Sequence, residues 1–289
     1  MSNDGLHRGN INLEGLPEQL KQPLTFLENK LGKDRPEVLI VLGSGLSDVM
    51  SGVKVLHSIP YSSIPQLPLS TVSGHLGVLE LVEYNGKKIA IMRGRFHIYE
   101  QGNTPDNTVR LIRVIGLLGI KAAILSSASG STSLKHKPGA LILMKDHIDI
   151  TRLSPLSSEE ASTLGPRFVD VSELYSIKLR KKILSAAKKE RIKICEGVYA
   201  YMKGPQYETA AEVHMMGRLG ADLVGMSTVH EVIALRQLNI DTAFISTATN
   251  YGTGVVKGKK LNHEEVKEIG KKTSANLDRL LKRVLTYPL

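Results

Sequence analysis

The stretch from residue 204 to residue 231, GPQYETAAEVHMMGRLGADLVGMSTVHE, constrains the fold most, because it changes structural type several times in quick succession. After a Gly-Pro break, Glu208 and Thr209 open an amphipathic helix. Gly220 predicts the end of that helix, since only glycine adopts positive φ without a Cβ penalty. Residues 223–224 then predict a short buried strand, so helix and strand alternate here.

The end of this predicted strand, at Met226 and Ser227, favours a ligand site. Ligands bind at the carboxyl ends of strands in α/β sheets, and helix N-termini leave backbone donors free. Glu208, in the first turn of the helix, can therefore face the same pocket as Met226 and Ser227. The alternative is that Glu208 only complements the helix dipole.

Polar stretches follow five predicted strands. They are residues 43–47, 95–100, 126–131, 226–231 and 247–252. Any one of them could be an ordinary turn. Because strand ends gather at one edge of an α/β sheet, the five together predict a composite active site.

The chain of 289 residues has no internal repeat and no linker between its predicted strands and helices. We therefore expect one α/β domain over residues 1–289, with a central twisted sheet flanked by helices. In this interpretation residues 1–35 form an N-terminal helical extension. Residues 153–166 are Ser-rich and lack periodicity, which predicts a mobile loop.

The first predicted anion site follows the apolar strand 38–42, which runs into Gly43-Ser44-Gly45. Glycine lets the backbone approach a phosphate, and the backbone amides and the Ser44 hydroxyl can donate to it. A lone Gly-Ser-Gly also occurs in many tight turns. The motif alone therefore leaves both interpretations open.

The second predicted anion site follows a β-hairpin marked by Asn-Gly at residues 85–86. If the second strand stays extended, a period of two puts Arg93, Arg95, His97 and Tyr99 on one face. Together these side chains can hold an oxyanion. The alternative is a solvated strand face with a structural histidine.

Composition narrows the classes of function. The formal net charge is +10, and much of it lies in residues 178–193 and 257–283, which both have helical periodicity. We interpret these stretches as solvated helix faces rather than a nucleic-acid surface. Tryptophan is absent and aromatic residues make up 4% of the chain, so few rings can stack on single-stranded bases. The positive charge also favours anionic substrates.

Cys195 is the only cysteine, which excludes an intramolecular disulfide and a cysteine metal cluster. It lies in the apolar run 192–198, so we predict a buried strand residue rather than a nucleophile. The first ten residues lack the apolar core of a signal peptide, and no apolar run reaches membrane-spanning length. These features predict a cytoplasmic protein without a membrane partner.

Several short motifs between residues 36 and 285 carry a resemblance to a known family. They are GSGL (43–46), GH (74–75), GRFHIYE (94–100), GPRF (165–168), EGVY (196–199), GPQYETAAE (204–212), LGADLVGMSTVHEV (219–232), TN (249–250) and NHEEV (262–266). In this order and spacing the chain resembles the low-molecular-mass, trimeric purine nucleoside phosphorylases. The resemblance implies a phosphorylase fold with a mixed sheet and a homotrimer. It also implies phosphorolysis of inosine, guanosine and their 2′-deoxy forms in purine salvage, with inorganic phosphate as co-substrate and no metal or organic cofactor.

The same resemblance implies roles for individual residues. Those for phosphate are Ser44, His75, Arg95, His97, Ser227 and the amide of Ala128. Those for ribose are Tyr99, Met226 and His263, with His263 near the 5′-hydroxyl. Those for the purine are Tyr207, Glu208, Val224 and Asn250. The catalytic candidates among them are His97, Glu208 and Asn250.

The chemistry of phosphorolysis explains why these residue types are needed. The ribosyl C1′ gains oxocarbenium character and the departing purine gains negative charge, while phosphate itself is the nucleophile. The enzyme therefore has to position phosphate and stabilise the leaving base. Asn250 would hydrogen-bond the purine N7, and Glu208 would accept from N1–H of a 6-oxopurine.

The chain departs from the family pattern in two regions, residues 126–131 and residue 230. Ser127 and Ser131 stand where TNAAGG usually has Asn and Gly, and His230 stands where a Pro is usual. Gly-Ser at 130–131 is similar to the methylthioadenosine phosphorylases, which generally lack the equivalent of Glu208 and carry Asp in place of Asn. Two alternatives stay open: a methylthioadenosine phosphorylase and a divergent, non-catalytic nucleoside-binding homologue.

Overall fold

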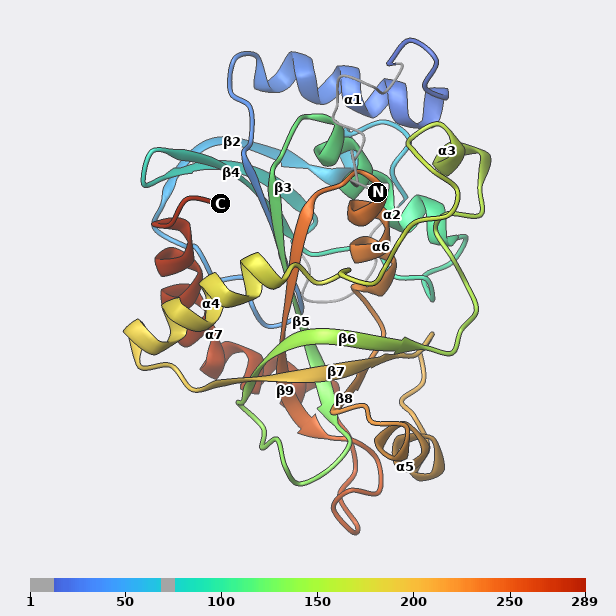
Figure 1. The fold of residues 1–289 in the computed structure, drawn as a ribbon, viewed down its shortest axis with the longest axis vertical. Coiled ribbons are helices and arrows are strands. Elements are labelled where there is room, and N and C mark those ends of the chain that lie inside the picture. Colours follow the sequence, from blue (N-terminus) through green and yellow to red (C-terminus); the bar gives the residue numbers. More distant parts are fainter. Residues whose placement is uncertain (1–12, 69–75) are drawn as a thin grey trace.

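Nine strands form one mixed sheet at the centre of the molecule (Figure 1). They are β1 (Val38–Leu42), β2 (Lys54–Pro60), β3 (Val78–Tyr84), β4 (Lys87–Arg93), β5 (Ala122–Ser131), β6 (Leu141–Asp149), β7 (Ile194–Tyr201), β8 (Leu223–Gly225) and β9 (Asp241–Tyr251). This computed structural model describes residues 13–68 and 76–289. The strand order is β2-β3-β4-β1-β5-β8-β7-β6-β9.

Part of the sheet closes on itself, because β5 pairs with β9 as well as with β1 and β8. The parallel β5–β9 ladder runs from Ala122 opposite Asp241 to Ser131 opposite Tyr251. The strands β5, β8, β7, β6 and β9 therefore form a ring, from which β1 to β4 extend as an open sheet. The predicted α/β class with a central mixed sheet is confirmed.

Helices cover the sheet on both sides (Figure 1). They are α1 (Glu18–Leu31), α2 (Pro105–Leu117), α3 (Glu159–Ser162), α4 (Ile177–Glu190), α5 (Ala210–Arg218), α6 (Val229–Gln237) and α7 (His263–Leu285), with a 3₁₀ turn η2 (Tyr61–Ser63). None of the described helices is both long enough and apolar enough to cross a membrane.

The strand β1 shows how one apolar run contributes to the hydrophobic cores on both faces of the sheet. All five of its residues are buried, as expected for a strand between two parallel neighbours. Because side chains alternate along a strand, Leu39 and Val41 pack in the core with α1, α2 and α6. Val38, Ile40 and Leu42 pack in the opposite core with α4 and α7.

The helix α2 begins with a capped first turn. Thr104 is its N-cap: the Thr104 hydroxyl accepts from Asn107 N at 3.3 Å, and Asn107 Oδ1 accepts from Thr104 N at 2.8 Å. Pro105 occupies the first helical position, where its missing N–H costs nothing. The cap and the proline extend the helix beyond its apolar stripe.

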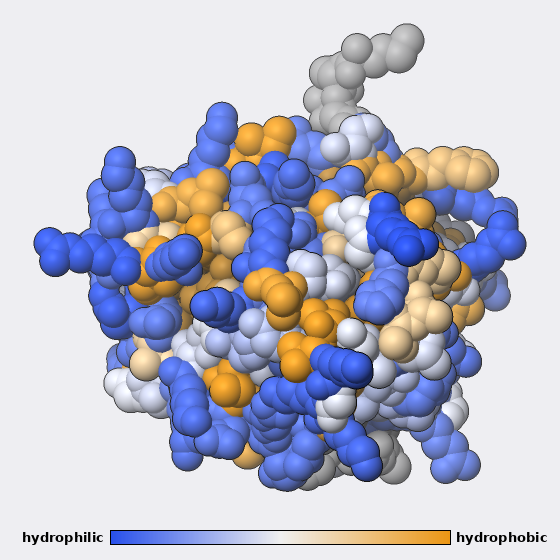
Figure 2. Space-filling model, turned by 90° about the horizontal axis from the view of Figure 1, so that it is seen from below, coloured by the Kyte–Doolittle hydropathy of each residue, from blue (hydrophilic) through white to orange (hydrophobic). Residues whose placement is uncertain are grey.

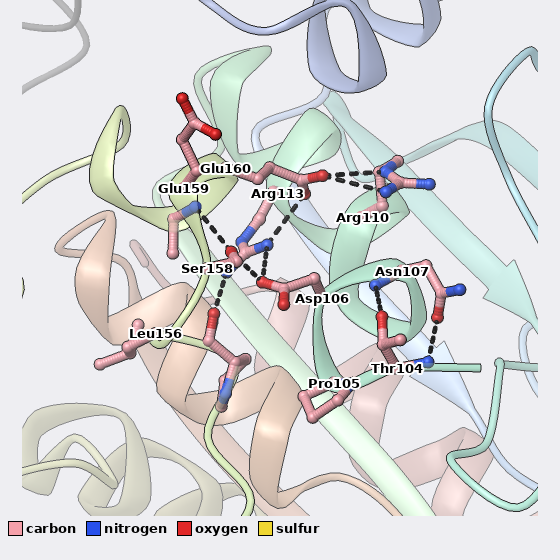
Figure 3. Close-up of polar contacts among 12 residues, drawn as sticks. Thr104, Pro105, Asp106, Asn107, Arg110, Arg113, Leu156, Ser158, Glu159 and Glu160 are labelled. Atoms are coloured by element: carbon pink, nitrogen blue, oxygen red, sulfur yellow. Dashed lines mark hydrogen bonds and ion pairs between the residues drawn. The ribbon is translucent and has the colours of Figure 1, made fainter. Parts of the chain in front are cut away.

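The segment 153–166, which the sequence predicts to be a mobile loop, contains the short helix α3 and is joined to α2 by ion pairs (Figure 3). Arg113 is fully buried, and its Nη1 donates to Glu160 Oε1 at 2.9 Å and to Asp106 Oδ1 at 3.1 Å. Arg110 donates to the other Glu160 oxygen. These contacts connect the segment to a helix that packs on the sheet.

The helix α7 contacts the Gly-Ser-Gly turn that follows β1. A Cβ at Gly270 would lie 3.2 Å from both Gly45 Cα and Ser44 O. A Cβ at Gly45, whose φ is +75°, would lie 2.9 Å from Lys267 O. Two glycines are therefore required where the C-terminal helix crosses the turn.

Candidate active site

One cavity of about 310 Å³ lies where β5, β8 and β9 end. It is lined by Ser44, Arg95, His97, Tyr99, Ser127, Ala128, Ser129, Gly130, Pro205, Tyr207, Glu208, Val224, Gly225, Met226, Ser227, Thr249, Asn250 and Val266. Every residue to which the family resemblance assigns a role lines it, apart from His75 and His263. His75 lies outside the described residues, as does the side chain of His263, the first residue of α7.

The predicted face of alternating side chains after the hairpin is correct only in part. The strand β4 ends at Arg93, and Gly94 has φ +110°. Arg93 points away from the cavity: its Nε donates to Glu80 Oε2 at 2.7 Å, and its Nη1 donates to backbone carbonyls after β1. Arg95, His97 and Tyr99 therefore reach the cavity from an irregular segment rather than from an extended strand.

Arg95 is held rigidly at one end of the cavity. Its Nε donates to Glu231 Oε1 at 3.0 Å, and its Nη1 donates to Ser126 O at 2.7 Å and to Ser227 Oγ at 3.4 Å. Arg95 is 1% exposed and Glu231 is 4% exposed. A buried guanidinium with fixed donors is suited to bind an anion.

His97 lies beside Arg95 and is also buried. Its backbone N donates to Glu100 Oε2 at 2.6 Å, and its ring stacks on Tyr99 with centroids 4.8 Å apart. Burial lowers the pKa of His97, against the opposing hydrogen bond to Glu100. Burial also raises the pKa of Tyr99 to about 12, so that its hydroxyl stays a donor.

Ser227 is positioned by an unusual backbone. Thr228, the next residue and the N-cap of α6, has φ +77° and ψ −38°, a conformation that non-glycine residues rarely adopt. Ser227 N donates to the hydroxyl of Tyr199 at 3.4 Å. Burial raises the pKa of Tyr199 to about 12. Such strained backbone is concentrated at functional sites.

The floor of the cavity consists of strand rather than the predicted loops. Residues 126–131 belong to β5 and residues 247–251 belong to β9, because the two strands stay paired to their ends. Ser127 and Ser129 both contact Ser246 through their hydroxyl oxygens, at 3.0 Å and 2.6 Å. The serine that replaces the usual Asn therefore joins a buried hydroxyl cluster.

Glu208 and Asn250 lie at the other end of the cavity. Glu208 is buried, its Oε1 has no hydrogen-bond partner among the described residues, and burial raises its pKa. Asn250 Oδ1 accepts from Thr249 Oγ1 at 3.1 Å, and its Nδ2 donates to Tyr251 O at 3.0 Å. An unsatisfied buried carboxylate beside an oriented amide is suited to read the polar edge of a ligand.

Between the Arg95 end and the Glu208 end of the cavity, close packing requires a glycine at position 204. Gly204 has φ +67°, and a Cβ there would lie 2.4 Å from Met226 Sδ and 3.0 Å from Tyr99 Cδ1. The predicted helix after it is α5, with Thr209 as N-cap and Gly220, at φ +100°, after its end. Val224 belongs to β8, and Tyr207 is partly exposed at the rim.

The sequence did not identify the residues that hold the cavity-lining side chains in place. Glu231 and Tyr199 do not line the cavity, yet they hold Arg95 and Ser227. Glu231 ends the polar stretch 226–231 after β8, but only its contact with Arg95 in the structure reveals this role. The prediction for Cys195 is wrong as to burial: Cys195 belongs to β7 but is exposed.

The chain is similar to known proteins along most of its length. The profile of the phosphorylase superfamily matches residues 37–286. Purine nucleoside phosphorylase 1 of Geobacillus stearothermophilus is 37% identical over 266 residues, which cover 92% of this chain and 96% of that protein. Purine nucleoside phosphorylase of Mus musculus is 35% identical over 253 residues, which cover 86% of this chain and 87% of that protein.

Solved structures give the same result. A Schistosoma mansoni purine nucleoside phosphorylase in complex with adenosine superposes with a TM-score of 0.88 at 34% identity, over 95% of this chain and 98% of that chain. A structure of purine nucleoside phosphorylase from the same organism in complex with inosine has a TM-score of 0.85 at 32% identity, with the same coverage. The chain belongs to the purine nucleoside phosphorylase family of the phosphorylase superfamily.

Proposed function

We propose that this protein cleaves purine nucleosides with phosphate, releasing the free base and (deoxy)ribose 1-phosphate for purine salvage. One observation carries the proposal: a single cavity joins anion-binding groups at Arg95, His97 and Ser227 to base-reading groups at Glu208 and Asn250. The names of the relatives, all purine nucleoside phosphorylases, support the same activity.

In the proposed mechanism, phosphate occupies the end of the cavity that contains Ser44, Arg95, His97, Ser227 and the amide of Ala128. The guanidinium and hydroxyl donors hold the phosphate oxygens beneath C1′, so the attack becomes effectively unimolecular. His97, neutral because burial lowers its pKa, adds a hydrogen bond without adding a full charge. The mechanism needs no resident metal or organic cofactor, because phosphate supplies the nucleophile.

The leaving base is stabilised at the opposite end. The amide of Asn250 donates to N7 as negative charge develops on the purine, and Glu208 accepts from N1–H. A donor directed at such developing charge typically supplies ~3–4 kcal/mol of transition-state stabilisation. Tyr207 and Val224 pack on the faces of the purine, while Tyr99 and Met226 contact the ribose.

Two histidines complete the proposed site. His75 is assigned to phosphate, and His263 to the 5′-hydroxyl at the start of α7. If His263 binds the hydroxyl, His263→Ala should reduce kcat/KM for inosine several-fold, the equivalent of ~0.5–1.5 kcal/mol. The reaction of 5′-deoxyinosine, which lacks that hydroxyl, should change much less. Efficient cleavage of methylthioadenosine by the unmodified protein would favour the rival phosphorylase class.

We also propose a homotrimer in the cytoplasm. Large apolar side chains are exposed at Leu134, Phe168 and Leu219, and Phe168 is 91% exposed. Figure 2 shows that apolar residues gather in patches on the face seen from below. Exposed apolar patches mark contact surfaces between proteins. Analytical ultracentrifugation tests the oligomeric state. A protein that sediments as a monomer at micromolar concentration would contradict the proposed homotrimer.

The decisive test is the release of hypoxanthine from inosine with and without phosphate. Base should appear only when phosphate is present, and Arg95→Ala should mainly raise the KM for phosphate. Arg218→Ala, at an exposed arginine on α5, is the matched control and should leave that KM unchanged. Equal release without phosphate would indicate a hydrolase, and no release at all would indicate a non-catalytic binding protein.

A further inference from the structure

Cys195, His136 and Asp222 form a hydrogen-bonded row that lies outside the active-site cavity. Cys195 Sγ lies 3.6 Å from His136 Nδ1, and His136 Nε2 lies 3.0 Å from Asp222 Oδ1. The three residues come from β7, from the connection between β5 and β6, and from the turn before β8. His136 is 4% exposed, whereas Cys195 is exposed, so the row ends in a thiol at the surface.

The carboxylate of Asp222 decides which nitrogen of His136 carries the proton. Burial opposes its ionisation, but hydrogen bonds from Lys135, the Val198 amide and His136 lower the pKa of Asp222 overall. An ionised carboxylate can only accept, so Nε2–H of His136 donates to it. The lone pair of Nδ1 then faces the thiol. A nucleophile, a base and a group that orients the base are thus in line.

The Cys195 thiol needs His136 as a base in order to react as a nucleophile. Partial burial and the nearby Asp222 carboxylate raise the pKa of Cys195, while Lys135 and Lys193 act against that rise. The thiol is therefore protonated at neutral pH, and an unassisted reaction would be slow, because the thiolate is the nucleophile. The two lysines also place positive charge near the sulfur, although Lys135 is paired with Asp222 at 2.8 Å. Asp222 also lines a neighbouring surface hollow, which contains Arg218 and His214.

We propose that Cys195 is a modification site that exchanges with anionic low-molecular-mass disulfides, of which glutathione disulfide is the representative. His136 Nδ1 takes the proton from Cys195 as Sγ attacks one sulfur of the disulfide. The new S–S bond forms as the old one breaks, and the leaving thiolate receives the proton from His136. One disulfide and one protein thiol give one mixed disulfide and one free thiol, without an external oxidant. The site is independent of the proposed phosphorolysis.

The test measures the rate of glutathionylation at pH 7 by intact-protein mass spectrometry. The reference is a peptide of residues 191–198, RIKICEGV, which keeps Lys193 but has no His136. The folded protein should react at least about tenfold faster than the peptide, since general-base assistance commonly contributes more than that. A folded protein that reacts no faster than the peptide overturns the proposal.

Variants separate the base from the charge. His136→Phe should lower the rate to that of the peptide or below, while cleavage of inosine shows that the variant is folded; an unchanged rate contradicts the role of His136. If this variant does not fold, the comparison of the unmodified protein with the peptide still tests whether the fold accelerates the reaction.

The variant Lys135→Gln tests the preference for anionic disulfides. It should lower the rate of reaction with glutathione disulfide several-fold, but the rate with neutral 2-hydroxyethyl disulfide should stay within about twofold. Equal effects on both disulfides would overturn the anionic preference.

Discussion

Glu231 and Arg95 form a buried ion pair at the end of the cavity where we propose that phosphate binds, with 3.0 Å between Glu231 Oε1 and Arg95 Nε. Both side chains are almost completely inaccessible to solvent. The pair holds the plane of the guanidinium, which Ser126 O and Ser227 Oγ also contact. Glu231, on the first turn of α6, therefore acts on the anion site through Arg95.

Removing Glu231 alone should destabilise the fold strongly. Glu231→Ala leaves a buried guanidinium without its counter-charge, and such a change typically costs about 3–5 kcal/mol of unfolding free energy. The double variant Arg95→Ala, Glu231→Ala should lose less than the sum of the two single losses. Urea unfolding of the four proteins measures this coupling. Glu268→Ala, which breaks a solvent-exposed pair with Lys272, is the control with a small effect; additive losses at 95 and 231 would contradict the coupling.

Substrate preference should depend on pH through Glu208. In the proposed site, ionised Glu208 accepts from N1–H of hypoxanthine, whereas adenine has only a lone pair at N1. An unmatched buried pair costs ~1–3 kcal/mol, so inosine should be preferred by about ten- to a hundredfold at pH 7.5. Burial raises the pKa of Glu208, so its protonated form becomes accessible at mildly acidic pH and can donate to adenine N1.

The ratio of kcat/KM for adenosine to that for inosine should therefore rise as the pH falls from 7.5 to 5.5. Glu208→Gln, whose amide offers both a donor and an acceptor at any pH, should remove this trend. A ratio that stays constant in the unmodified protein would show that Glu208 does not read N1.

The free energy of unfolding should fall as the medium becomes mildly acidic. Burial lowers the pKa of His97, His147 and His230 below the ordinary 6.5. Below pH 6.5 the unfolded chain binds protons at these rings that the folded chain does not, so their contribution is complete above pH 6.5 and is lost as pH decreases. Glu208, whose pKa is raised, works in the opposite sense, but it is a single group.

The urea midpoint should therefore be lower at pH 5.5 than at pH 7.5. His230→Phe removes one of the three buried rings and should reduce the difference between the two midpoints. A midpoint that does not move over this interval would contradict the proton linkage.

The ion pairs of Glu160 should keep the segment 153–166 ordered. Glu160→Ala removes the carboxylate that pairs with Arg110 and one of the two carboxylates that pair with the fully buried Arg113. Limited proteolysis should then cut within this segment much faster than in the unmodified protein. Glu159→Ala, at the exposed neighbour in the same helical turn, is the matched control and should leave the rate unchanged. Equal cleavage of both variants would show that the ion pairs do not restrain the segment.

The helices and strands that could be predicted from the sequence are those marked by a local pattern of residues, such as an apolar run, an N-cap or a glycine stop. The run 38–42 is apolar throughout and lies at the centre of the sheet, and the helix after Thr209 has both a cap and a glycine stop. The edge strand β2 was not predictable, because most of its residues are partly or fully exposed and leave no apolar pattern. The helix α6 was also missed, since it is buried on nearly all sides and has no amphipathic period.

The site was predictable as a set of residue types but not as a shape. The sequence motifs contain most of the residues that line the cavity. The small polar residues of 126–131, however, indicated a loop, whereas in the structure they pair with β9 and form a strand. Cys195 looked buried because its neighbours are apolar, although β7 exposes it. The contact between Glu231 and Arg95 spans 136 positions in the sequence, and only the tertiary structure brings the two together.

The pair Gly45 and Gly270 joins the two ends of the domain at van der Waals distance. Any side chain at Gly270 would displace the turn that carries Ser44, and any side chain at Gly45 would displace α7. A substitution at Gly270 therefore requires a shift of the turn after β1, and a substitution at Gly45 requires a shift of α7. The choice of residue at each position thus constrains the other, although the two lie more than 200 residues apart in the sequence.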